Sequence, residues 1–185
     1  ADRVEPDADA GLTWARVAAV REVTEETGVL LDPDGLLWFS YWTPPESSRK
    51  RFGTHFFVCA STDAETAVVL DAAEADDWAW LRPTDAMDGH DAGTIELRVP
   101  TWITLEQLHR YATVDETLAG LAADEPEHFA TVLADDGTSP VALYHGDAGY
   151  HSGDATLDGP RHRLVMHADG WRYDRDGFPS RRRAV

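Results

Sequence analysis

Three glutamates lie close together in the stretch REVTEETGV, residues 21–29. On a helix, residues four apart share a face and residues three apart nearly do, so Glu22 and Glu26 would be stacked with Glu25 beside them. Their charges would repel one another, and the partial negative charge of a helix C-terminus would add to the repulsion. Carboxylate oxygens on one face are the ligands that Mg²⁺ or Mn²⁺ prefers. The spacing alone fits either a divalent-metal site or a solvated helix end softened by Arg21.

These side chains need a helix that ends just after them. The stretch GLTWARVAAVREVTEET, residues 11–27, predicts such a helix, with Val17, Val20 and Val23 on its apolar side. Gly28 follows, and glycine is favoured just past a helix end because it adopts a positive φ without strain. We therefore expect the acidic side chains in the last turn of a helix that ends at Gly28.

The string REVTEETGV also resembles the second half of the Nudix box, G-x5-E-x7-R-E-U-x-E-E-x-G-U, in which U is aliphatic. The resemblance implies a Nudix α/β/α sandwich and hydrolysis of a nucleoside diphosphate linked to another moiety. It implies that Glu22 and Glu26 are the main ligands of a Mg²⁺ or Mn²⁺ cofactor, which would neutralise and position the diphosphate. Glu25 would be an auxiliary ligand, or the group that Arg21 orients. Glu22 would assist deprotonation of the attacking water.

The first half of the box departs from this pattern. The slot for the box glutamate holds Thr13, and the slot for the box glycine holds Asp7. The stretch RVEP, residues 3–6, resembles the opening of many such boxes, with extra residues before the helix, so Asp7 or Asp9 could stand in for the glutamate. We expect that N-terminal strand(s) of the fold are missing from this chain. A non-catalytic Nudix-like module that binds a nucleotide or protein therefore stays open.

A longer box loop resembles the coenzyme A diphosphatase branch of the superfamily, the peroxisomal type and its bacterial relatives. Four stretches carry this resemblance: AAVREVTEETGVLL, WTPPESSRKRFGTHFFVCA, WAWLRPTDAM and GTIELRVPTWITLEQL. It implies cleavage of coenzyme A or acyl-CoA into adenosine 3′,5′-bisphosphate and (acyl-)phosphopantetheine. A Nudix hydrolase acting on an ADP-sugar or a dinucleotide is the alternative.

Further residues are candidates for binding the substrate. Arg49, Lys50 and Arg51 form a basic cluster that could hold phosphate groups, with Arg51 and Arg49 as the first candidates, or they belong to a solvated hairpin loop. Glu96 and Glu74 are candidates for the extra carboxylate that Nudix sites recruit from a distant loop. Glu96 lies between two apolar residues in a segment expected to be extended, so it would point away from them.

The pattern before residue 123 predicts strands and helices in one α/β domain, for which the Nudix resemblance implies a mixed sheet. LLWFSYW and RFGTHFFVCAS are typical of strands. A further strand would end at Arg82-Pro83, and Thr84 would cap the short helix that follows. The leucines of residues 101–122 indicate two helices that meet near Thr113-Val114-Asp115.

Short β segments with DG or GD turns follow residue 122 and suggest a meander. We therefore expect an incomplete Nudix domain at residues 1–122 and a β-rich extension at residues 123–185 packed on it.

The composition limits the partners. The net charge of −18 argues against nucleic acid or an anionic membrane surface as a partner. The single cysteine, Cys59, excludes an intrachain disulfide, and no apolar stretch approaches the roughly 20 residues that span a bilayer. We expect a cytoplasmic protein whose partner is a small-molecule nucleotide substrate, and a homodimer stays open.

Overall fold

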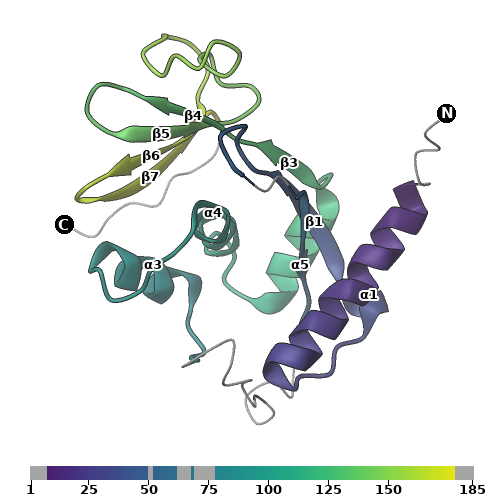
Figure 1. Ribbon diagram of the computed structural model, residues 1–185. Helices are drawn as coiled ribbons and strands as arrows, with labels where there is room; N and C mark the ends of the chain where they lie inside the picture. The colour runs from purple at the N-terminus through teal and green to yellow at the C-terminus, as the bar shows by residue number, and fades with distance from the viewer. Residues whose placement is uncertain (1–7, 50–51, 62–67, 69–77, 178–185) are drawn as a thin grey trace, which may run out of the picture.

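The protein combines helices with two β-sheets, which confirms the predicted α/β class (Figure 1). The computed structural model describes residues 8–49, 52–61, 68 and 78–177. Its elements follow one another in this order: α1 (Ala8–Thr27), η1 (Pro33–Gly35), β1 (Leu37–Thr43), β2 (Thr54–Val58), α3 (Pro83–Asp91), α4 (Val99–Leu108), α5 (Val114–Ala123), β3 (Glu127–Ala130), β4 (Val132–Asp135), β5 (Pro140–Leu143), β6 (His162–His167) and β7 (Gly170–Arg175).

The first sheet is mixed and has the strand order β2-β1-β3. β1 and β2 lie in the two apolar runs that the sequence predicts as strands; β1 pairs antiparallel with β2 and parallel with β3. In Figure 1, α1 and α4 lie on opposite sides of β1. β3 follows residue 122 in the chain but lies beside β1 in this sheet, and the division into residues 1–122 and 123–185 stays a prediction.

The second sheet is an antiparallel meander of the order β4-β5-β6-β7, as the turn-rich C-terminal sequence predicts. One aromatic core joins it to the first sheet. Trp42 of β1 stacks on Phe129 of β3 at 4.2 Å between ring centroids, and Tyr144 meets Phe129 edge to face at 5.2 Å. The same buried cluster contains residues from α3, α4, β5, β6 and β7: Met87, Trp102, Ile103, Ala142, Leu164 and Tyr173. The two sheets and α4 therefore share one hydrophobic interior.

The predicted boundary between two helices near residue 113 is confirmed. Thr113 is the N-cap of α5, and its hydroxyl accepts a hydrogen bond from the Glu116 N–H at 3.2 Å. Glu116 Oε2 in turn accepts from the Ala112 N–H at 3.0 Å. This reciprocal arrangement satisfies backbone donors that a helix start leaves without partners.

Two local predictions around residue 83 are wrong. Residues 78–82 form no strand, and Thr84 does not cap α3. The N-cap is Arg82, which makes no side-chain capping bond, and Pro83 occupies the first turn. Proline is favoured there because its fixed φ suits a helix and its missing N–H needs no partner. The helix consequently starts one residue before Thr84.

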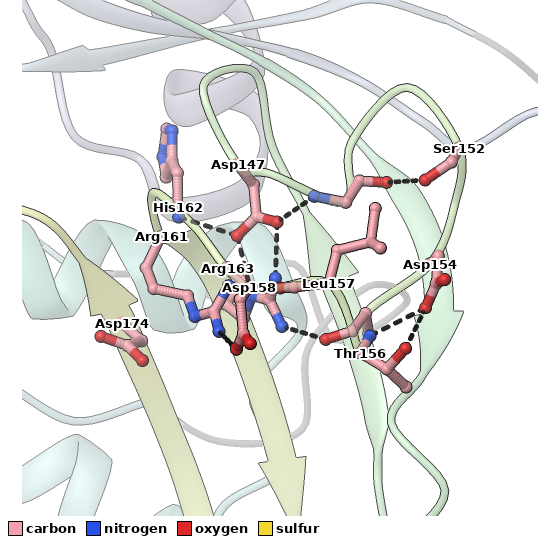
Figure 2. Close-up of polar contacts among 12 residues, drawn as sticks. Asp147, Ser152, Asp154, Thr156, Leu157, Asp158, Arg161, His162, Arg163 and Asp174 are labelled. Carbon is pink, nitrogen blue, oxygen red and sulfur yellow. Dashed lines mark hydrogen bonds and ion pairs between the residues drawn. The ribbon is translucent and has the colours of Figure 1, made fainter.

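A buried ion pair fixes the long loop between β5 and β6 (Figure 2). Arg163 Nε donates to Asp147 Oδ2 at 2.7 Å, and Arg163 Nη2 donates to Oδ1 at 2.6 Å. The backbone N–H groups of Gly149 and His162 donate to the same carboxylate at 2.8 and 2.9 Å. Arg163 Nη1 also donates to the Ala155 carbonyl. Four donors around one carboxylate offset the cost of burying its charge.

We predict that Asp147→Asn lowers the free energy of unfolding at neutral pH by about 3–5 kcal/mol, because it leaves the Arg163 guanidinium buried without its charge partner. Burial raises the pKa of Asp147, but the hydrogen bonds from Arg163, His162 and Gly149 outweigh it and bring the pKa below its ordinary 3.8. The stabilisation is thus present above that value and is lost as the pH falls through the lowered pKa. Urea unfolding between pH 2 and 7 measures both effects.

In this experiment the variant should lose part of the wild-type pH dependence below pH 4, roughly the ordinary titration range of an aspartate. Asp158→Asn is the matched control, because Asp158 is fully exposed and lies 3.8 Å from Arg161. Equal stability losses in the two variants would contradict the assigned role of the ion pair.

Candidate metal and diphosphate site

The helix that carries the three glutamates ends where the sequence predicts. α1 runs from Ala8 to Thr27, and Gly28 follows with a φ of 70°. The Gly28 N–H donates to the Thr24 carbonyl at 2.9 Å. The hydroxyl of Thr27 donates to the Val23 carbonyl at 2.6 Å. The positive φ of Gly28 thus ends the helix immediately after the acidic turn.

α1 is attached to the segment before β1. Arg16 Nε donates to the Leu36 carbonyl at 3.2 Å. Val20 and Val23 are half-buried, as the predicted apolar side requires, but Val17 is 49% exposed. The expectation that Val17 belongs to a buried face is therefore wrong.

Arg21 lies between two of the three glutamates. Its Nη2 donates to Glu22 Oε1 at 2.5 Å, and its Nε lies 3.8 Å from Glu25 Oε1. The hydrogen bond to Glu22 and the charges of Glu22 and Glu25 raise the pKa of Arg21 above its ordinary value. All three side chains are more than half exposed. Arg21 therefore reduces the carboxylate repulsion through contacts that water and salt screen.

Glu26 is exposed and lies one helical turn beyond Glu22. No group of three or more His, Cys, Asp or Glu side chains gathers into a metal site within the described part of the chain. Mg²⁺ does not need such a cage, because it is commonly held by one or two carboxylates with water and substrate phosphates completing the octahedron. The donor chemistry of Glu22 and Glu26 fits such an ion, although Glu22 is engaged by Arg21 in this structure.

The other candidate residues lie apart from this cluster or outside the described residues. Glu96 is 76% exposed and pairs with Arg98, whose Nη2 lies 3.1 Å from Glu96 Oε1. Its neighbours in the chain are half-buried, so it points away from them as expected, but the segment is not a strand. Arg49 is exposed in the loop after β1. The remaining candidates lie outside the described residues: Asp7, Lys50, Arg51 and Glu74. Asp9 lies in the first turn of α1.

Arg98, the ion-pair partner of the candidate Glu96, was not among the residues singled out from the sequence. The alternation of exposed and half-buried residues from Ile95 to Arg98 places Glu96 and Arg98 on the same side of the chain. In the sequence, this two-residue spacing of opposite charges could have indicated that Glu96 and Arg98 form an ion pair. Arg98 is also the N-cap of α4, and Pro100 lies in the first turn of that helix.

Comparison with known proteins gives one positive finding. The family model described as the NUDIX domain matches residues 8–103. This range contains α1, the antiparallel pair β1–β2, α3 and the first half of α4. No curated protein and no solved structure matches the chain significantly. Among the described residues, no helix has the length and apolar character needed to cross a membrane.

We predict that Arg21→Gln lowers the melting temperature at low ionic strength, because the glutamates and the helix dipole then lose their nearest positive charge. The loss should shrink in about 1 M salt, where the Debye length is about 3 Å. Thermal unfolding followed by circular dichroism at both salt concentrations measures it. Arg172→Gln is the control, because Arg172 is similarly exposed and contacts one carboxylate at 3.8 Å. A loss that is the same in high salt would mean that Arg21 acts through packing instead.

Proposed function

Because the matched range covers more than half of its residues, this protein belongs to the Nudix family, and we propose that it hydrolyses coenzyme A or acyl-CoA at the diphosphate. Family membership indicates a hydrolase that acts on pyrophosphate-containing nucleotide derivatives and generally uses a divalent metal such as Mg²⁺ or Mn²⁺. The mixed sheet with helices on either side agrees with the Nudix α/β/α fold. The observation that carries the proposal is the cluster of Arg21, Glu22, Glu25 and Glu26 at the end of α1.

In this proposal Glu22 and Glu26 would hold the divalent ion. The bound ion would neutralise the charge of the diphosphate and polarise the phosphorus–oxygen bonds of the diphosphate. Arg21 orients Glu22 and Glu25, the two carboxylates that it contacts in the structure. Glu25 is an auxiliary ligand. Glu22 accepts the proton of the attacking water, whose oxygen bonds to one phosphorus while the bridging phosphorus–oxygen bond breaks. The other phosphate leaves with the bridging oxygen.

The substrate class rests on the coenzyme A-type sequence stretches. The products would be adenosine 3′,5′-bisphosphate and (acyl-)phosphopantetheine. Arg49 and Arg51 would bind phosphate groups, and Glu96 would contribute an additional carboxylate. The exposure of Arg49 supports this role, since a substrate must reach it from solvent. An ADP-sugar or a dinucleotide is the alternative substrate, and Thr13 in the slot of the box glutamate favours a non-catalytic binding module as the second candidate.

A cytoplasmic location is part of the same proposal. Cys59 is half-buried, and burial raises the pKa of its thiol, so the residue is packed rather than activated. A lone, unreactive cysteine suits a reducing compartment.

We predict that Glu26→Gln reduces metal-dependent hydrolysis at least a thousandfold, because a neutral amide is a much poorer ligand for a hard cation. Formation of adenosine 3′,5′-bisphosphate from coenzyme A with Mg²⁺ or Mn²⁺ measures turnover, and calorimetry with Mn²⁺ measures binding. Glu46→Gln is the matched control, since Glu46 is exposed in the loop after β1. Circular dichroism should show both variants folded. Undiminished turnover in Glu26→Gln would refute the assignment of the metal site.

We predict that the specificity constant kcat/KM for coenzyme A or acyl-CoA exceeds that for an ADP-sugar or a dinucleotide by roughly tenfold or more. In Arg49→Ala, KM should rise more than kcat falls, because a residue that only binds phosphate stabilises ground and transition states alike. Steady-state kinetics with the three substrate classes measures both quantities. Faster cleavage of an ADP-sugar would replace the substrate class while keeping the Nudix activity. Tight nucleotide binding without any turnover would favour the non-catalytic module.

A further inference from the structure

A second candidate site lies away from the acidic helix, where the C-terminal end of β1 and the start of β2 meet the first turn of α4. A cavity of about 440 Å³ opens there. Its walls are mostly apolar side chains: Trp42, Pro44, Pro45, Phe56, Val99, Pro100 and Leu133. Concave, largely apolar pockets of a few hundred cubic ångströms with few polar groups are typical small-molecule sites.

The one charged side chain among the lining residues of this cavity is the cation Arg98, although the whole chain is strongly acidic. Arg98 lines the cavity and is the N-cap of α4, but its side chain makes no capping bond. The first turn of α4 contains no acidic residue. The partial positive charge of this helix start is therefore not offset by a carboxylate from α4 itself, and it adds to the guanidinium charge of Arg98.

The ion pair of Arg98 with Glu96 does not prevent a ligand from reaching the guanidinium of Arg98. Both side chains are largely exposed, 84% and 76%. Pairs of this kind contribute little because each partner is well hydrated and the chain entropy opposes the contact. A carboxylate on a ligand can therefore replace Glu96 at the guanidinium while its apolar tail enters the cavity.

From this combination we infer that the cavity binds a monocarboxylate with an apolar tail, of the medium-chain fatty acid type. The carboxylate pairs with Arg98 at the start of α4, and the tail packs against Phe56, Val99 and Leu133. The neutral polar groups of the lining are hydroxyls, from Thr43, Thr54, Thr101 and Thr131, and none of these demands a second charge on the tail. The site is independent of the diphosphate chemistry proposed for α1.

Isothermal titration calorimetry of the full chain, without metal or nucleotide, tests the inference with hexanoate, octanoate and decanoate below their aggregation concentrations. Burial of each added methylene should tighten binding by about fourfold. Decanol has the same tail without the charge and should bind more weakly than decanoate.

Two variants test the contact of the ligand's carboxylate and the contact of its apolar tail separately. Arg98→Gln should weaken decanoate about tenfold through loss of the charge-assisted contact, while decanol binding stays as in the wild type. Leu133→Glu places a charge at the apolar wall and should abolish binding of both ligands. The matched controls are Arg172→Gln and Leu157→Glu, which make the same changes at exposed positions outside the cavity. Both controls should bind like the wild type.

Each contrary result overturns the inference. No heat with any of the acids removes the site. Equal binding in Leu133→Glu and the wild type shows adsorption elsewhere on the surface. Binding of decanoyl-CoA without binding of decanoate shows that the cavity does not recognise a free carboxylate. Glu26→Gln should bind decanoate like the wild type, so failure here and failure of the proposed hydrolase are distinguishable.

Discussion

The stacked pair of Trp42 and Phe129 is the contact on which the architecture depends. The two rings lie 4.2 Å apart, belong to neighbouring strands β1 and β3, and are almost completely buried. Tyr144 contacts both rings edge to face, which extends the interior of the first sheet into the second. Trp102 and Ile103 of α4 belong to the same cluster. Aromatic side chains bury the largest areas, so three rings at one junction can hold two small sheets and a helix together.

The acidic end of α1 is built on the opposite principle. Its side chains stay in solvent, and the opposing charge that the described residues bring to them is a single arginine. Arg21 meets Glu22 closely and Glu25 at longer range, so the repulsion is reduced but not removed. The remaining negative charge at this helix end favours the binding of a multivalent cation. Glu26 is exposed, so its carboxylate is accessible as a ligand. A stability cost tolerated at a helix terminus is thus consistent with a binding role.

Local signals in the sequence predicted local structure well. Gly28 marks the end of α1 because a positive φ is required there, and Thr113 marks the start of α5 because its hydroxyl caps it. Thr84 is not the N-cap of α3 because the adjacent Pro83 occupies the first turn of the helix, where proline is favoured. Both kinds of outcome follow from backbone chemistry within a few residues.

What could not be predicted depends on contacts between distant residues. Nothing in the sequence near Trp42 indicates that Phe129 will stack on it, or that β3 will join β1 in parallel. The glutamates of the candidate site were visible as a motif, but the preference of Arg21 for Glu22 over Glu25 depends on side-chain geometry that spacing leaves undetermined.

The buried pair of Asp147 and Arg163 has an evolutionary consequence. Replacing either residue by a neutral one leaves the charge of the other buried without a partner. The carboxylate of Asp147 also accepts a hydrogen bond from the Gly149 N–H, which fixes the backbone there. A Cβ at Gly149 would come within 2.1 Å of the Asp154 carbonyl oxygen, so that position is restricted as well. Exposed residues of the loop can therefore change freely during evolution. Asp147, Arg163 and Gly149 must instead be conserved together or substituted together.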